Sequence, residues 1–268
     1  MLRLIIIFCL SLLFIQTSQA DEFDHSIWDD LLKSHVVNLN EDQPNQATAM
    51  DYDALSVNQT ALQNYLEQVS KISKSDFDNW PVDERLAFLL NVYNAATAQL
   101  VLTAYPDIKS IRDIGSFFNS PFRKDFISLF GETISLDDIE KGMVTGDDNY
   151  NDPRAHFALN CASISCPALR REAYSGVDLN EQLNEQMRAF LVDRSRNQLE
   201  GNTLRVSKIF DWYDDDFESG WMNIERLEDF LALNADALGL SSAQSDALKA
   251  GDIKIRYFDY DWSLNRLR

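Results

Sequence analysis

A carboxylate, an imidazole and a thiol follow one another along the middle of the chain, and these are the groups that a cysteine nucleophile requires. His156 lies in an apolar stretch, Arg154–Asn160, that we predict to be a buried strand, and Cys161 follows directly. If the chain turns at the end of this strand, the imidazole could deprotonate the thiol. Glu140, on a preceding predicted helix, could orient the imidazole. The pattern indicates nucleophilic catalysis by Cys161.

The same residues leave other interpretations open. Cys166 could itself be the nucleophile, or it could form a disulfide with Cys161, because four intervening residues make such a bridge geometrically feasible. His156 could equally be a hydrogen-bonded core residue with no chemical role. The spacing of the histidine and the two cysteines matches no common zinc motif, so we expect no metal site and no cofactor.

Two asparagines are candidates for substrate or oxyanion binding. Asn91 and Asn94 share one face of a helix that we predict over 83–104, where their amides could donate to a substrate carbonyl. The alternative is that these amides hold neighbouring loop backbone in place. Apolar residues occupy nearly every side of this helix, so we expect it to be buried at the centre of the fold.

Other polar residues are expected to be solvated. The acidic loop Asp147–Asp152 lacks the ligand order of a calcium-binding loop, and we interpret it as a turn. The run Asp214–Asp216 could line a cleft, although a charged surface rim is the expectation. His25 and His35 lie in a polar N-terminal segment, where we expect surface positions.

The hydrophobic pattern predicts more helix than strand. Ser135 with Asp138 resembles the capping box that begins a helix. The connection Gly131-Glu132 predicts a hairpin between two short strands. Without a regular alternation of strands and helices, the expected class is α+β, a helix-rich single domain around a small, mainly antiparallel sheet. Helices are expected at 27–32, 61–72, 83–104, 138–143, 179–192 and 224–233, and strands at 126–130, 133–136, 204–207 and 253–258.

The N-terminus has the parts of a secretory signal peptide. Arg3 precedes an apolar stretch, Leu4–Ile15, and small residues follow at Ser18 and Ala20. The apolar stretch is about a dozen residues long, whereas a membrane span needs roughly 20. We therefore expect cleavage after Ala20, export to the periplasm or the extracellular space, and no membrane association of the mature chain.

Acidic residues dominate the composition. The chain has 43 acidic and 24 basic residues, and loss of Arg3 with the signal peptide would change the formal net charge from −19 to −20. Such a surface repels phosphate backbones, so we expect no nucleic-acid partner. A cationic or neutral substrate would meet less repulsion than an anionic one.

Five ordered segments carry a family resemblance. They are Arg85–Ala95, Ile134–Glu140, His156–Pro167, Ser207–Tyr213 and Tyr260–Asn265. Together they resemble the marker motifs of the domain-of-unknown-function 547 family, over a region from about Asp51 to the C-terminus. The expected organisation is a signal peptide at 1–20, a helical lead and linker at 21–50, and one domain of this family at 51–268.

The resemblance implies a distant relation to cysteine-peptidase and transglutaminase-like proteins, and a fold of that kind. It implies active groups at Glu140, His156 and Cys161. In the family, histidine often follows the glutamate, whereas this chain has Lys141. The resemblance supplies no substrate.

Two functional hypotheses follow from the sequence. The first is an exported thiol-dependent hydrolase or acyl transferase that acts on an amide or related acyl bond of a peptide-like or small-molecule substrate through a Cys-His-Glu relay. The second is a noncatalytic binding or scaffold domain in which Cys161 and Cys166 form a disulfide. The state of the two thiols distinguishes these hypotheses.

The signal-peptide assignment predicts that the exported protein begins at Asp21. Mass analysis of the N-terminus of exported material tests this expectation. A membrane-bound product that retains residues 1–20 would contradict it.

Overall fold

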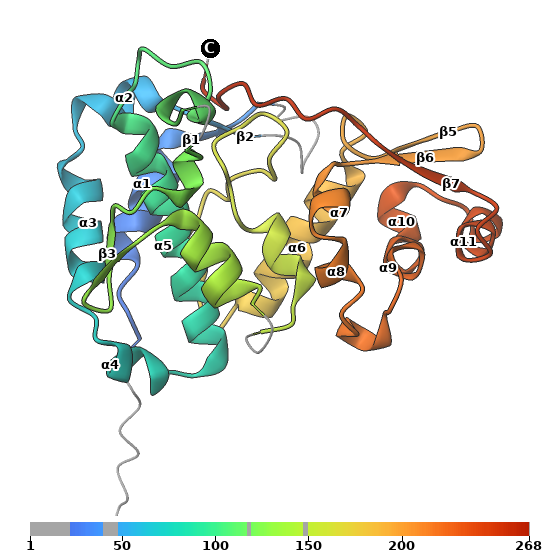
Figure 1. Ribbon diagram of the computed structural model, residues 1–268, viewed down its shortest axis with the longest axis horizontal. Coiled ribbons are helices and arrows are strands. Elements are labelled where there is room, and N and C mark those ends of the chain that lie inside the picture. Colours follow the sequence, from blue (N-terminus) through green and yellow to red (C-terminus); the bar gives the residue numbers. More distant parts are fainter. Residues whose placement is uncertain (1–21, 40–47, 117–118, 147–149, 268) are drawn as a thin grey trace, which may run out of the picture.

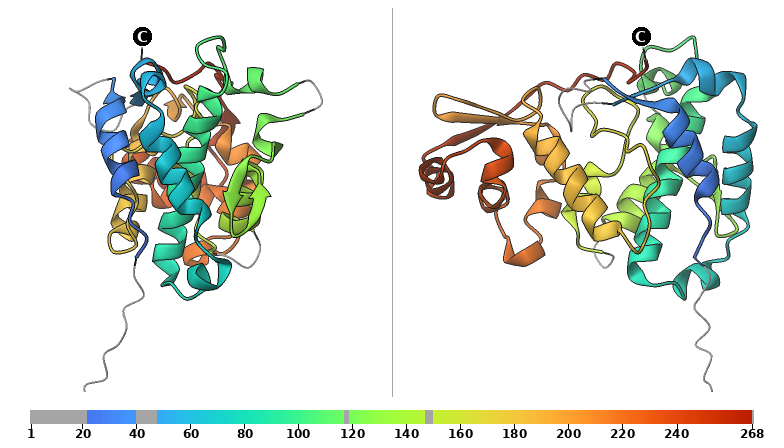
Figure 2. Two further views of the ribbon diagram at one scale, coloured as in Figure 1. Left: turned by 90° about the vertical axis from the view of Figure 1, so that its left-hand side faces the viewer. Right: turned by 180° about the vertical axis from the view of Figure 1, so that it is seen from behind.

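The chain folds into two lobes, each with its own hydrophobic cluster (Figures 1 and 2). The computed structural model describes residues 22–39, 48–116, 119–146 and 150–267, so the predicted signal peptide lies outside the described residues. In this described part, none of the helices has the length and apolar character needed to cross a membrane.

The first lobe is built around α5 (Val82–Leu102), the predicted central helix. Every side chain from residue 86 to residue 98 is buried, which explains why apolar residues occupy all sides of this helix. Figure 1 shows α1 and α3 alongside α5 in this lobe. The other helices of the lobe are α1 (Ser26–His35), α2 (Tyr52–Val57), α3 (Thr60–Ser70) and α4 (Lys74–Asp78).

The N-terminal lead is an integral part of the first lobe. Trp28 on α1 is fully buried in its hydrophobic cluster. At the end of this lead, β1 (Val36–Asn38) pairs antiparallel with β2 (Thr48–Met50). The expected surface position of His25 is wrong: its Nδ1 lies 2.8 Å from the Tyr65 hydroxyl, and burial lowers the pKa of this imidazole to about 3.

The predicted hairpin is confirmed, with its turn shifted by one residue. Strand β3 (Ile127–Leu129) pairs antiparallel with β4 (Glu132–Ile134), so the turn residues are Phe130 and Gly131. Both have positive φ, 55° and 82°, as the right-handed twist of a two-residue hairpin requires. The helical turns η1 (Ile111–Ile114) and η2 (Pro121–Arg123) precede this hairpin.

The predicted capping box is confirmed. Ser135 donates from both its backbone N–H and its hydroxyl to the Asp138 carboxylate, and the Asp138 N–H donates to the Ser135 hydroxyl. This reciprocal bonding satisfies two donors at a helix start. The helix that follows, η3 (Asp138–Val144), has π-helical hydrogen bonds and carries Glu140.

The strand predicted at Arg154–Asn160 is wrong. This stretch begins as the 3₁₀-helix η4 (Pro153–Phe157) and continues as a loop. Pro153 occupies the first helical position, and the Asp152 side chain accepts a hydrogen bond from the Arg154 N–H. Every residue of the stretch is buried, and a run that is buried on all sides has no periodicity that separates strand from helix.

The predicted helix α6 (Leu179–Val192) is confirmed, and its side chains pack in both hydrophobic clusters. The second lobe contains a three-stranded sheet in the order β5-β6-β7. The pair β5 and β6 is antiparallel, whereas β6 and β7 are parallel. The helix predicted at 224–233 is shorter, because extended backbone at Arg226 delays its start. The remaining elements are β5 (Gln198–Glu200), β6 (Thr203–Val206), α7 (Ile209–Trp212), α8 (Asp214–Phe217), η5 (Trp221–Asn223), α9 (Leu227–Leu233), α10 (Ala235–Leu238), α11 (Ser242–Lys249) and β7 (Lys254–Tyr257).

The predicted α+β class is confirmed, because helices dominate and the strand pairing is mostly antiparallel. The described strands form three small sheets in place of the single sheet that was expected. Such small sheets cannot organise a fold of this size, so the helices of each lobe supply its core.

The buried asparagines of α5 hold loop backbone in place. The Asn94 amide donates to the Ala158 carbonyl at 3.0 Å and accepts from the Asn160 N–H at 2.8 Å. Asn91 makes the same pair of bonds with the carbonyl and N–H of Tyr174, at 2.8 and 2.9 Å. Each amide therefore replaces the partner that a strand would have offered to these buried backbone groups.

We predict that Asn94→Leu destabilises the fold, because it leaves the Ala158 carbonyl and the Asn160 N–H buried without a partner. Each unmet group costs about 1–3 kcal/mol. Urea unfolding followed by far-UV circular dichroism measures the loss.

Thr97→Val on the same buried helix face is the matched control. The Thr97 hydroxyl has no hydrogen-bond partner within the described ranges, so its removal is expected to be neutral or slightly stabilising. Equal unfolding free energies for the Asn94 variant and the original chain would contradict the assigned role.

Candidate active site

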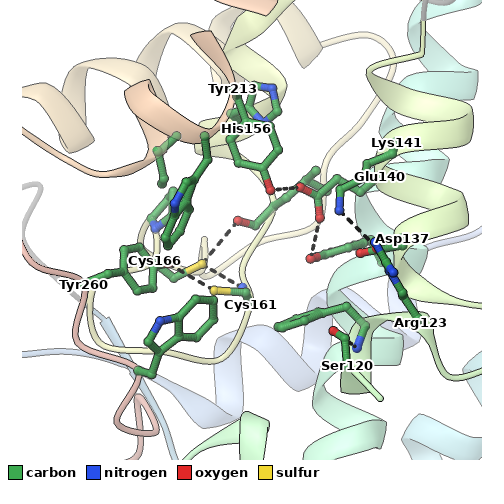
Figure 3. Close-up of a pocket in the computed structure, with 17 residues that line it drawn as sticks. Ser120, Arg123, Asp137, Glu140, Lys141, His156, Cys161, Cys166, Tyr213 and Tyr260 are labelled. Atoms are coloured by element: carbon green, nitrogen blue, oxygen red, sulfur yellow. Dashed lines mark hydrogen bonds and ion pairs between the residues drawn. The ribbon is translucent and has the colours of Figure 1, made fainter. Parts of the chain in front are cut away.

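A cavity of about 360 Å³ contains the residues that the sequence singles out. Tyr93 and Glu140 enter it from the first lobe, and Trp212 and Tyr213 enter it from the second. The His156 ring and the sulfur-bearing residues Cys161 and Cys166 also line it (Figure 3). The volume is in the range of small-molecule sites in proteins.

A tight turn after η4 carries Cys161. The Asn160 side chain accepts a hydrogen bond from the Ala162 N–H at 3.0 Å and donates to the Pro167 carbonyl at 2.7 Å. Ala162 has φ of 58°, a left-handed conformation that costs a residue with a Cβ about 1–2 kcal/mol. Strain of this kind concentrates at functional sites, where the surrounding hydrogen bonds maintain it.

The C-terminal segment completes the site. The N–H of Ile164 donates to Ser263 at 2.9 Å, and the N–H of Asn265 donates to Ala162 at 3.1 Å. These backbone bonds hold the segment alongside the cysteine turn and bring Tyr260 to Cys161. The last predicted marker segment thus contacts the third one, although a hundred residues separate them in the sequence.

The Cys161 sulfur is surrounded by hydroxyl groups. Its Sγ lies 3.1 Å from the Ser163 hydroxyl and 3.2 Å from the Tyr260 hydroxyl. The Ser163 hydroxyl donates to Tyr260 at 3.2 Å, which leaves the Tyr260 proton available for the sulfur. Burial opposes ionisation, but the hydrogen bonds between Cys161 and Cys166, Ser163 and Tyr260 outweigh it and lower the pKa of Cys161.

Cys166 has the opposite character. Burial, followed by the neighbouring Cys161, raises the pKa of Cys166 well above its ordinary value. Its Sγ accepts a hydrogen bond from the Cys161 N–H at 2.7 Å, and both cysteines are free. The disulfide considered from the sequence is therefore not formed in this structure. Of the two thiols, Cys161 is the one poised to ionise.

His156 is held by a carboxylate that the sequence did not single out. The His156 Nε2 lies 2.7 Å from Asp216 Oδ2, and the imidazole side chain is only 2% exposed. Phe217, fully buried in the second lobe, anchors α8 and so places the neighbouring Asp216 at the ring. The run Asp214–Asp216 was expected to be a surface rim, and for Asp216 this is wrong.

Glu140 is held by two tyrosines. Tyr93 donates to Glu140 Oε2 at 2.9 Å, and Tyr213 donates to Oε1 at 2.5 Å. Burial and the nearby Glu140 raise the pKa of both phenols, so both remain donors. The Tyr213 ring also packs on His156, with centroids 4.1 Å apart. Glu140 thus reaches the imidazole through Tyr213, and the direct hydrogen-bond partner of His156 is Asp216.

The remaining candidates have structural partners. Asn91 and Asn94 bond to loop backbone, and the lining of the cavity does not include them. The predicted solvated loop at 147–152 lies partly outside the described residues, and its last residue, Asp152, binds the Arg154 guanidinium. Within the described ranges, no cluster of three or more His, Cys, Asp or Glu side chains could hold a metal ion.

A buried arginine fixes the far side of the cysteine loop. Arg196 forms an ion pair with Asp193 and donates to the carbonyls of Ile164 and Cys166. Because Arg196 follows α6, the second lobe helps to position the turn that the first lobe's Asn94 also holds. The cysteine loop is thus held by hydrogen bonds from both lobes.

Comparison with known proteins supports the predicted family. No curated protein and no solved structure matches the chain. A match is found with the model of a family described as "Protein of unknown function, DUF547", over residues 77–191. The matched residues contain three of the five marker segments, and the segments at 207–213 and 260–265 lie beyond them. The family predicted from the motifs is thus supported over residues 77–191, which match the DUF547 model and carry Glu140, His156 and both cysteines of the cavity.

Proposed function

We propose that this protein is a thiol-dependent hydrolase or acyl transferase that acts on an amide or related acyl bond. The observation that carries the proposal is the Cys161 thiol, which lines a cavity and has a pKa lowered by hydroxyl donors. A thiolate is the reactive form of cysteine, and a lowered pKa makes it available near neutral pH.

The first step transfers the Cys161 thiol proton to His156 and forms a bond between the Cys161 sulfur and the substrate carbonyl carbon. The carbonyl π electrons move to oxygen, which becomes an oxyanion. Tyr260 has its pKa raised by burial and then by the neighbouring thiols, so its hydroxyl keeps the proton that an oxyanion needs.

The second step breaks the carbon–nitrogen bond. The oxyanion re-forms the carbonyl, the nitrogen leaves with a proton from His156, and a thioester to Cys161 remains. Water then attacks the thioester carbon and gives a proton to His156. The carbon–sulfur bond breaks, which releases the acid and restores the Cys161 thiolate. If an amine replaces the water, the same sequence transfers the acyl group.

The proposed relay uses two carboxylates. Asp216 accepts from or pairs with His156 at 2.7 Å and holds the ring in one orientation. Glu140 acts indirectly, because it accepts a hydrogen bond from Tyr213 and so holds the Tyr213 ring against the imidazole. The relay predicted from the sequence therefore keeps its nucleophile and its imidazole, and we propose Asp216 as the group that orients the imidazole.

We further propose that the protein works outside the cytoplasm after loss of residues 1–20. The charged start, short apolar stretch and small residues at the expected cleavage site support this proposal. The free thiols would then have to survive in a compartment that favours disulfides. The buried position of Cys166 protects one of the pair.

Selective alkylation tests the nucleophile. Iodoacetamide at about pH 6, where an ordinary thiol with a pKa near 8.5 is protonated, should label Cys161 before Cys166. Tyr260→Phe should slow this labelling, because it removes a hydrogen bond that lowers the pKa of Cys161. Peptide mapping by mass spectrometry measures both rates.

Tyr105→Phe is the matched control, since the Tyr105 hydroxyl bonds to Asp53 on the surface. Preferential labelling of Cys166, or equal and slow labelling of both thiols, would contradict the proposal. Two blocked thiols that only a reductant releases would instead favour the binding domain with a disulfide.

A comparison of two carboxylates tests the relay. If Asp216 orients the imidazole, Asp216→Asn should lower amide or thioester hydrolysis by at least about tenfold and change its pH profile. Glu140→Gln keeps an acceptor for Tyr213 and should have the smaller effect. Kinetics with a chromogenic acyl ester as probe measure both. A larger loss in the Glu140 variant would restore Glu140 as the direct partner.

A further inference from the structure

One wall of the cavity is a cluster of aromatic rings. The ring centroid of Trp212 lies 4.7 Å from that of Tyr260 and 5.7 Å from that of Trp262, and the Tyr260 and Trp262 centroids are 4.6 Å apart. The Trp212 residue is 42% exposed although it packs in this cluster. Tyr260 also bonds to the Cys161 sulfur, so the aromatic wall begins beside the nucleophile.

Another part of the cavity lining carries positive charge. Arg123 and Lys141 both pair with Asp137, at 3.4 and 3.0 Å, and one carboxylate neutralises only one of the two cations. Their side chains are 77% and 54% exposed, whereas that of Asp137 is 18% exposed. The charges of these three side chains sum to +1. Glu140 is a further carboxylate of the lining, but it is buried and its two oxygens accept hydrogen bonds from two tyrosines.

This group stands out in an acidic chain. The sequence has 24 basic residues against 43 acidic ones, and its overall charge repels anions. Charges farther away than about 8 Å are largely screened at physiological ionic strength, so the local group decides what the cavity accepts. A substrate carboxylate placed here would exchange weak ion pairs at the surface for charge-assisted hydrogen bonds.

The nucleophile lies between these two regions. In Figure 3, Tyr260 is on one side of Cys161 and Cys166, and Arg123, Asp137 and Lys141 are on the other. A substrate carbonyl at the Cys161 sulfur would thus have the aromatic rings on one side and the two cations on the other. Planar apolar groups stack on such a surface.

We infer that the cavity takes an N-acyl amino acid, or a peptide C-terminus of that form, with a planar apolar acyl group on Trp212, Tyr260 and Trp262 and a carboxylate on Arg123 and Lys141. This inference rests on the proposed function for the bond that is cleaved. The anion preference that it assigns differs from the expectation based on net charge alone.

Binding to an inactive variant tests the inference without any turnover. The probes are N-benzoylglycine and its neutral amide, N-benzoylglycinamide, which differ only in the carboxylate. Titration of Cys161→Ser with each probe, followed by tryptophan fluorescence and calorimetry, should show about tenfold tighter binding of the acid. The double variant Arg123→Gln, Lys141→Gln in the same background should remove this preference and retain binding of the amide.

Lys124→Gln is the matched control, because Lys124 is an exposed neighbour of Arg123 that is not part of the cavity lining. The control should keep the preference for the acid. Equal affinities for the two probes, no binding of either, or a preference that survives the double variant would overturn the inference.

The probe titration and the alkylation of Cys161 test the substrate class and the thiol mechanism separately. Selective labelling of Cys161 with no preference for the acid would leave the thiol mechanism and remove this substrate class. A preference for the acid with unreactive thiols would leave a binding site for these compounds and remove the proposed hydrolysis.

Discussion

The hydrogen bond between the Cys161 sulfur and the Tyr260 hydroxyl joins two residues that are 99 positions apart, and the chemistry of the site depends on it. Without the hydrogen bonds to Cys166, Ser163 and Tyr260, burial would raise the pKa of Cys161 and leave an inert thiol. Backbone hydrogen bonds between the cysteine turn and the C-terminal segment bring Tyr260 to this sulfur. The pKa of Cys161 is therefore lowered only once the chain has folded.

Local patterns in the sequence predicted most helices and the hairpin, but they did not predict contacts between residues that are far apart in the chain. The helix α5, the hairpin and the capping box at Ser135 follow from residues close in sequence. The strand predicted at 154–160 was wrong because burial on all sides removes the periodicity that distinguishes a strand from a helix. Asp216 was missed because its bond to His156 spans 60 residues, and an acidic run resembles a solvated surface when it is read alone.

The site combines two kinds of support with different consequences. Asn94, Asn160 and Arg196 satisfy buried backbone groups around the turn, so their loss should affect the stability of the fold before any chemistry. Tyr260 and Asp216 instead bond to the sulfur and to the imidazole themselves. Of the first set, Asn94 could be anticipated from the rarity of asparagine inside an apolar helix. The second set depends on how the two lobes meet.

The central claim is that hydroxyl donors lower the pKa of Cys161, and titration of its thiolate tests it most directly. With both cysteines intact, so that the hydrogen bond between Cys161 and Cys166 is kept, the rate of iodoacetamide labelling of Cys161 is followed against pH by peptide mapping and reports the pKa of this thiol. The account predicts a pKa below the ordinary value near 8.5, and a higher pKa when Tyr260→Phe is added. A pKa at or above the ordinary value, unchanged by the loss of the Tyr260 hydroxyl, would contradict it.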